Sequence, residues 1–172
     1  MIRKTIKTIF FLLIFGSGFC FSQTANLNLV KAIQESEKVL LISHEDYRLI
    51  IEQPGNSTII DRELFKDGLP NAEIIQQQIE LNPKLKSELA DVISYQKNTT
   101  DEEGVDCFWP HHSILLYRQG KWSYVDLCFS CDHYAHSPDL IIRKDEFLVT
   151  YEQWRTLENF FRKLQLDYKL QK

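Results

Sequence analysis

The sequence predicts an α+β domain in which an antiparallel sheet packs against helices. Three observations predict it: segments rich in β-forming residues between 39 and 64, a hairpin pattern within 113–131, and an amphipathic closing segment over 151–166. Strands that are grouped along the chain and followed by a closing helix are typical of the α+β class.

The N-terminal residues have the order of a secretory signal. The first seven carry three basic side chains and no acid, residues 8–15 are nearly all apolar, and small residues follow at 16–18. This apolar run is shorter than the roughly 20 residues that span a bilayer. We therefore expect a signal over residues 1–22, cleavage after Ser22, and one exported domain, periplasmic or secreted, over residues 23–172. A lipid anchor at Cys20 is the alternative, although Phe19 stands where lipoprotein signals have a small residue.

Charge and motifs exclude several function classes. The chain carries a net charge of −4 and the signal carries +3, so residues 23–172 carry −7. An acidic domain without a basic patch is a poor candidate for nucleic-acid binding. No further apolar run predicts a membrane span, and no glycine-rich phosphate loop or Gly-x-Ser-x-Gly elbow occurs. We expect no enzyme activity, and an envelope or extracellular partner.

The first half of the domain is predicted to contain both helices and strands. Apolar spacing predicts a short helix over 27–38, followed by strands at 39–43, 47–51 and within 57–64, with a turn at Pro54-Gly55-Asn56. Helices are predicted over 71–80, where Asn71 can cap, and over 84–95. Residues 98–106 are polar and acidic and predict a solvated loop.

The second half contains the clearest pattern. Apolar residues 114–117 and the β-forming run 122–129 flank Gln119-Gly120, which predicts a hairpin. Residues 140–142 and 147–149 are further strand candidates. Trp154, Leu157 and Phe161 share one helical face of the closing segment, a stripe that indicates core packing rather than a ligand site.

Three cysteines of the mature domain gather at the open end of this hairpin. With a two-residue turn, opposed residue numbers sum to 239, so Cys128 faces His111 and Cys131 faces Phe108. Pro110 favours a bulge that would bring Cys107 opposite Cys131. The geometry therefore predicts that the sulfurs and the His111-His112 pair lie close together.

Three chemistries are open to this cluster. Export favours a structural disulfide from Cys107 to Cys131 or Cys128, with Cys131 preferred. The spacing Cys107-x4-His112-x15-Cys128-x2-Cys131 also suits a tetrahedral zinc site, and three other histidines are candidates to replace His112: His111, His133 and His136. The third possibility is a redox pair of Cys128 and Cys131, which is less favoured because catalytic Cys-x-x-Cys pairs usually begin a helix.

The cysteine motif resembles that of a group of uncharacterised bacterial exported proteins. Their pattern is Cys-Phe-x-Pro, an aromatic residue or histidine, an apolar strand and Cys-Phe-x-Cys, which here corresponds to residues 107–110 and 128–131. The similarity extends from the helix near Leu85 to the helix near Phe161. It implies that the three cysteines and Pro110 belong together, and it assigns no substrate.

Overall fold

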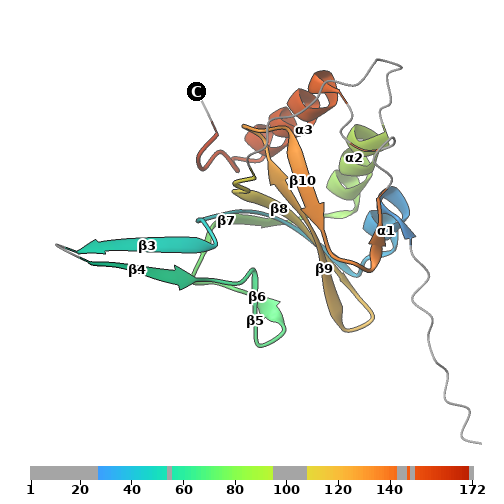
Figure 1. The fold of residues 1–172 in the computed structure, drawn as a ribbon. Helices are drawn as coiled ribbons and strands as arrows, with labels where there is room; N and C mark the ends of the chain where they lie inside the picture. Colours follow the sequence, from blue (N-terminus) through green and yellow to red (C-terminus); the bar gives the residue numbers. More distant parts are fainter. Residues whose placement is uncertain (1–26, 54–55, 95–107, 143–146, 148–149, 171–172) are drawn as a thin grey trace, which may run out of the picture.

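A five-stranded antiparallel sheet organises the protein. The computed structural model describes residues 27–53, 56–94, 108–142, 147 and 150–170. The strand order is β10-β9-β8-β2-β7 (Figure 1). The strands are β2 (Lys38–His44), β7 (Ile75–Glu80), β8 (His112–Arg118), β9 (Lys121–Cys128) and β10 (His133–His136). Together with the helices they confirm the α+β class.

Three helices cover one face of the sheet: α1 (Leu29–Glu35), α2 (Pro83–Ser94) and α3 (Tyr151–Lys163) (Figure 1). Their starts are fixed by polar caps. The Asn28 side chain accepts a hydrogen bond from Val30 N in α1, and Thr150 forms a reciprocal capping box with Gln153 in α3. Such caps satisfy N–H groups that have no partner inside the helix.

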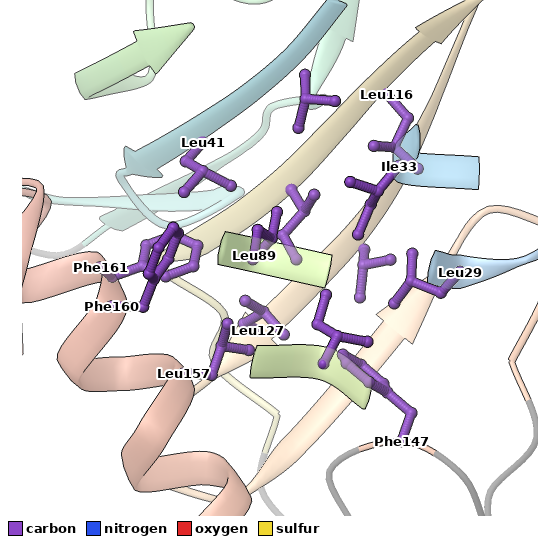
Figure 2. Close-up of a cluster of buried hydrophobic side chains, with 14 of the residues drawn as sticks. Leu29, Ile33, Leu41, Leu89, Leu116, Leu127, Phe147, Leu157, Phe160 and Phe161 are labelled. Carbon is purple, nitrogen blue, oxygen red and sulfur yellow. The ribbon is translucent and has the colours of Figure 1, made fainter. Parts of the chain in front are cut away.

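The main core lies between these helices and the sheet (Figure 2). Leu41, Leu127, Leu157 and Phe161 are each fully buried there. The predicted stripe of α3 therefore packs on the sheet, as expected for an amphipathic helix.

The opposite face of the sheet carries a smaller hydrophobic cluster. Its buried core consists of Ile42, Leu64, Ile74 and Leu115. The remaining strands are β1 (Leu27–Asn28), β3 (Arg48–Gln53), β4 (Asn56–Asp61), β5 (Phe65–Lys66), β6 (Leu69–Pro70) and β11 (Leu140–Ile141). Strands β3 and β4 pair with each other and project from the body as a ribbon (Figure 1).

The β8–β9 hairpin has the predicted register. Pairs from Arg118↔Lys121 to His112↔Leu127 all follow the expected sum, and the turn is Gln119-Gly120. Both turn residues have positive φ, 50° and 77°, as a type I′ turn requires. Strand β9 ends at Cys128. The expected continuation of the register, with Cys131 opposite Phe108, is therefore wrong.

The predicted helix over 71–80 is wrong. Asn71 does not cap a helix; its side chain accepts from Glu73 N and donates to Glu63 O within a turn. Residues 75–80 then form edge strand β7, paired with β2, with alternating partly buried and exposed side chains. Pairing with β2 outweighed the helix propensity of a glutamine-rich segment, because propensity is a weak prior against tertiary context.

The other elements differ from expectation mainly in their ends. Helix α1 stops at Glu35, and α2, α3 and strands β2, β3 and β4 lie within a few residues of the predicted ranges. The signal at 1–22, the acidic loop at 98–106 and most of the strand candidate at 147–149 lie outside the described residues. The domain boundary at 23 stays a prediction.

Candidate functional site

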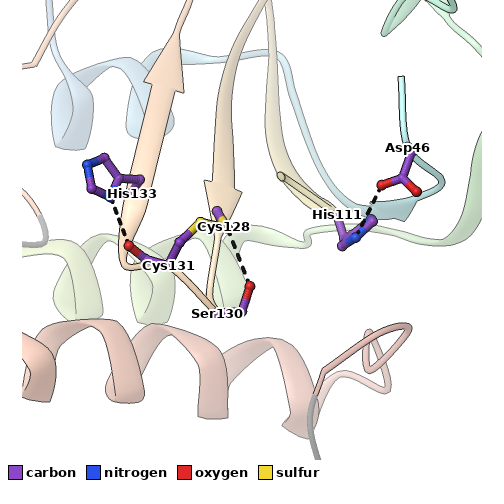
Figure 3. The surroundings of a disulfide bond; sticks show 6 residues. All are labelled: Asp46, His111, Cys128, Ser130, Cys131 and His133. Carbon is purple, nitrogen blue, oxygen red and sulfur yellow. Dashed lines mark hydrogen bonds and ion pairs between the residues drawn. A yellow bond between two sulfur atoms is a disulfide. The ribbon is translucent and has the colours of Figure 1, made fainter. Parts of the chain in front are cut away.

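The two cysteines at the end of β9 form a disulfide. Cys128 is the last residue of β9, and the chain reverses through Phe129 and Ser130 so that His133 pairs with Cys128 at the start of β10. The Cα atoms of Cys128 and Cys131 are 5.5 Å apart, and these residues are 1% and 2% exposed. Figure 3 shows the bond at this turn. The chain reversal therefore brings the sulfurs into bonding range, which fits disulfide geometry.

The Cys128–Cys131 bond replaces the Cys107–Cys131 bond that the sequence favoured. Cys131 is bonded to Cys128 and not to Cys107, because β9 ends before Cys131 and the chain turns towards β10 instead of continuing opposite Phe108. Cys107 lies outside the described residues, so its state and the four-residue metal set stay predictions. Within the described ranges, no group of three His, Cys, Asp or Glu side chains is arranged to hold a metal ion.

His112 lies on the helix-covered face of the sheet, away from solvent. It is 1% exposed, and its ring makes edge contacts with Phe129 and Phe161, with ring centroids 5.1 and 5.5 Å apart. Burial lowers the pKa of His112 to about 3, although a hydrogen bond to the backbone of Leu166 acts in the opposite direction. Its Nε2 atom has no hydrogen-bond partner among the described residues.

A cavity of about 240 Å³ lies beside His112 and the disulfide turn. The sheet end and the turn contribute Trp109, His111, His112, Phe129, Ser130 and Asp132. Helix α3 contributes Tyr151, Arg155 and Glu158, and the C-terminal segment contributes Lys169 and Leu170. Elements distant in sequence therefore build one pocket, and the disulfide holds the turn that forms part of its wall.

Three charged side chains of this wall, Arg155, Glu158 and Lys169, take part in ion pairs. The Glu158 carboxylate has a 6% exposed side chain and accepts from Arg155 and, at 2.6 Å, from Arg162 Nη2. Arg155 also lies over the Tyr151 ring, 4.8 Å from its centroid. Lys169 Nζ is 3.6 Å from Asp46 Oδ2. The wall of the pocket is therefore polar and carries charges of both signs.

A second polar cluster lies on the opposite face of the sheet. Asp126 accepts hydrogen bonds from Ser113 Oγ at 2.6 Å and from Tyr47 Oη at 2.8 Å. Burial raises the pKa of Asp126 to about 6, and the two hydrogen bonds act in the opposite direction. Burial and the Asp126 charge also raise the pKa of Tyr47. These bonds fasten Tyr47, which precedes the β3–β4 ribbon, to the sheet.

His44 and His111 extend this cluster towards the pocket. The His44 ring is buried and stacks on Tyr47 with centroids 4.9 Å apart; burial lowers the pKa of His44 to about 4. His111 Nε2 is 3.3 Å from Asp46 Oδ1 (Figure 3). Burial lowers the pKa of His111, with Asp46 acting in the opposite direction.

Apart from His111, this cluster was not predicted from the sequence, although part of it carried a signal. Ser113 and Asp126 are opposed in the hairpin register, so their pairing follows from the turn at Gly120. Tyr47 and His44 come from elsewhere in the chain, and no local pattern places them there. Of the remaining histidine candidates, His133 Nδ1 contacts Cys131 O at 2.8 Å and His136 Nδ1 contacts Ser137 O at 3.0 Å.

No family model, curated protein or solved structure matches this chain. The resemblance based on the cysteine motif therefore stays a prediction. Within the part of the chain that the structure describes, no helix has both the length and the apolar character needed to cross a membrane.

Proposed function

We propose that the protein is an exported, non-enzymatic binding domain in which the Cys128–Cys131 disulfide has a structural role. The observation that carries this proposal is the burial of both cysteines, 1% and 2% exposed, directly beside a polar cavity. Thiol–disulfide exchange requires access of a thiolate to one of the sulfurs, so a buried pair is poorly suited to redox catalysis.

The position of the pair in the fold supports the same role. A low thiol pKa in catalytic Cys-x-x-Cys motifs owes much to a helix N-terminus. Here Cys128 ends a strand and the pair closes a tight turn. The turn carries Phe129, Ser130 and Asp132 into the cavity wall. The bond therefore fixes the shape of a binding site.

The pairing of charges in the wall supports binding rather than acid–base chemistry. Arg155, Glu158 and Arg162 are engaged with one another, and Lys169 is near Asp46. A general acid or base acts best with a pKa near the working pH. Burial moves the pKa of His112 to about 3, far from that range.

The reduction potential of the pair tests this proposal. The experiment uses mature protein, residues 23–172, purified from the exported fraction, with Cys107→Ala as a control that leaves only Cys128 and Cys131. A structural pair is expected below about −300 mV and does not catalyse insulin reduction. A potential near the roughly −270 mV of thioredoxin, with insulin reduction, would make the protein a thiol oxidoreductase instead.

The same preparation tests export and metal binding. An N-terminus at Gln23 in the exported fraction is the expected result for the signal. Metal analysis of the untreated protein is expected to find no bound zinc. One zinc per chain, with three thiols that react only after chelation, would replace the disulfide with a site formed by Cys107, His112, Cys128 and Cys131.

A further inference from the structure

We infer that the β3–β4 ribbon of one copy of this chain extends the sheet of a second copy, with β4 pairing antiparallel to the outer edge of β7 and Ile59 facing the groove beside that edge. This interface between copies is separate from the cavity beside His112 and does not depend on the function proposed above. Three features carry it: an outward-facing sheet edge, an apolar groove beside that edge, and a projecting ribbon whose backbone and side chains match both.

The outer edge of β7 has backbone groups that face away from the sheet. β7 is the last strand of the five-stranded sheet, and no other described strand pairs with this edge. Leu81 N donates to Val39 O at 2.9 Å, so the hydrogen-bonded pairs with β2 recur at every second residue from there. The N–H and C=O groups of Gln78 and Glu80 therefore point away from β2. Such an edge is a template for another strand, and β7 has no lysine or proline that would block it.

A groove of about 490 Å³ lies beside this edge. Gln78 and Glu80 line it together with the apolar side chains of Leu40, Leu69 and Trp122. Leu69 of β6 is 64% exposed. A strand that pairs with β7 places every second side chain on the groove side of the sheet. An apolar side chain at such a position would therefore cover the exposed apolar surface of the groove.

Strand β4 of the projecting ribbon meets both requirements (Figure 1). Arg62 N donates to Tyr47 O at 2.6 Å, so by the same alternation the backbone groups of Ile59 and Asp61 point away from β3. Residues opposite each other in an antiparallel pair have their side chains on the same face. When Ile59 lies opposite Gln78, its side chain therefore faces the groove. Ile59 is 57% exposed in the single chain, so its burial in the groove is favourable.

Charge and side-chain type favour this ribbon as the occupant. In this register Asp61 lies opposite Gln76, and no acid lies opposite Glu80, so like charges do not meet. Two copies of β7 paired edge to edge would present only glutamine and glutamate side chains to the apolar groove. Since every copy carries one ribbon and one edge, the contact either closes into a dimer by reciprocal exchange or continues as an open chain.

The test is the mass of the mature protein, residues 23–172, measured by sedimentation over a range of concentrations. We expect the average mass to rise above that of one chain as the concentration rises. Ile59→Lys and Leu69→Lys are each expected to weaken association roughly tenfold, because each brings an ammonium group into an apolar contact. Both side chains are exposed, so the fold is retained. Ile141→Lys is the matched control, because Ile141 is 44% exposed and lies in β11, outside the ribbon and the groove.

Replacement of Gln78 tests the strand pairing itself. Gln78→Pro removes an N–H that points away from β2, so β7 keeps its bonds to β2 while the added strand loses one. This variant is expected to associate more weakly than the wild type. Gln78→Ala removes the side chain and keeps this N–H, and it is expected to associate like the wild type. Denaturation curves establish that each variant is folded.

Mixtures of variants identify the two halves of the contact. Ile59→Lys keeps an intact groove and Leu69→Lys keeps an intact ribbon, so their mixture is expected to form dimers at a concentration where neither does alone. In a Cys107→Ala background, chains with Ile59→Cys should form a disulfide with chains that carry Gln78→Cys. Hydrogen-bonded opposed residues have Cα atoms about 5.5 Å apart, which suits this bond. Ile60→Cys is the control, because its side chain lies on the other face of the ribbon.

Three results would overturn the inference. The first is a protein that stays monomeric up to its highest soluble concentration. The second is association that Ile59→Lys leaves unchanged, which would indicate pairing of two β7 edges or another surface. The third is association that Ile59→Lys weakens and Gln78→Pro does not, which would place the ribbon on another part of its partner. None of these results bears on the cavity beside His112, because its wall shares no residue with the ribbon or the groove.

Discussion

Removal of the Cys128–Cys131 bond should lower stability only modestly, because the loop it closes is short. The two residues are three positions apart, so the bond closes a loop of about four residues. Chain entropy then gives about 2 kcal/mol at 25 °C. The expected pairing of Cys107 with Cys131 would close about 25 residues and give about 3.5 kcal/mol by the same relation. The magnitude therefore distinguishes the two pairings.

The assay is chemical denaturation of the mature protein with and without reductant, since reductant breaks the bond without removing an atom. Cys107→Ala is expected to show the same reductant effect as the wild type, whereas the double variant Cys128→Ala/Cys131→Ala should show none. A loss of about 2 kcal/mol corresponds to a fall in Tm of about 4–8 °C in a domain of this size. A reductant effect near 3.5 kcal/mol that disappears in Cys107→Ala would refute the reasoning.

The remaining predictions concern pH, the turn and the core. Burial raises the pKa of Asp126 to about 6 and lowers the pKa values of His44 and His112 to about 4 and 3. As pH falls from 7 to 4.5, the folded protein therefore takes up a proton at Asp126, whereas the two histidines stay neutral. Proton uptake at Asp126 stabilises the folded protein in acid and so opposes the destabilisation caused by the two buried histidines. Between pH 7 and pH 4.5, the free energy of unfolding of Asp126→Asn is expected to fall by about 2 kcal/mol more than that of the wild type. Equal losses in denaturation curves would contradict this. Gly120 has a φ of +77°, which residues with a side chain rarely adopt. Gly120→Ala should therefore lower the free energy of unfolding by about 1 kcal/mol, although the added methyl group meets open space. An unchanged Tm would argue against this turn geometry. Leu157 of α3 is fully buried against the sheet. Leu157→Ala should lower the free energy of unfolding by about 3 kcal/mol in denaturant titrations. A loss below about 1 kcal/mol would place Leu157 outside the core.

Where the local pattern was strong, the sequence was sufficient to predict the structure. Gln119-Gly120 between two β-forming runs determined the whole β8–β9 register, because a two-residue turn leaves one way to pair the strands. The apolar stripe with Trp154, Leu157 and Phe161 likewise predicted which face of α3 is buried. Both signals are local and need no knowledge of distant residues.

Where a partner from elsewhere in the chain decided, sequence reasoning failed. Residues 75–80 form a strand because β2 offers an edge to pair with, and the segment alone does not reveal that edge. The pairing of Cys131 depended on where β9 ends, which is set by β10 joining the sheet. The candidate site combines the sheet end, α3 and the C-terminal segment, so among its wall residues only His111 and His112 were proposed beforehand as site residues, in another role.

The closed Cys128–Cys131 pair, which holds the pocket wall, is the feature on which the proposed function depends most directly. Exported protein, alkylated before any reduction and then digested for mass spectrometry, tests this in one measurement. The expected result is an alkylated Cys107 and a single peptide that holds Cys128 and Cys131 joined to each other. A cross-linked peptide that contains Cys107, or three alkylated cysteines, would contradict the account.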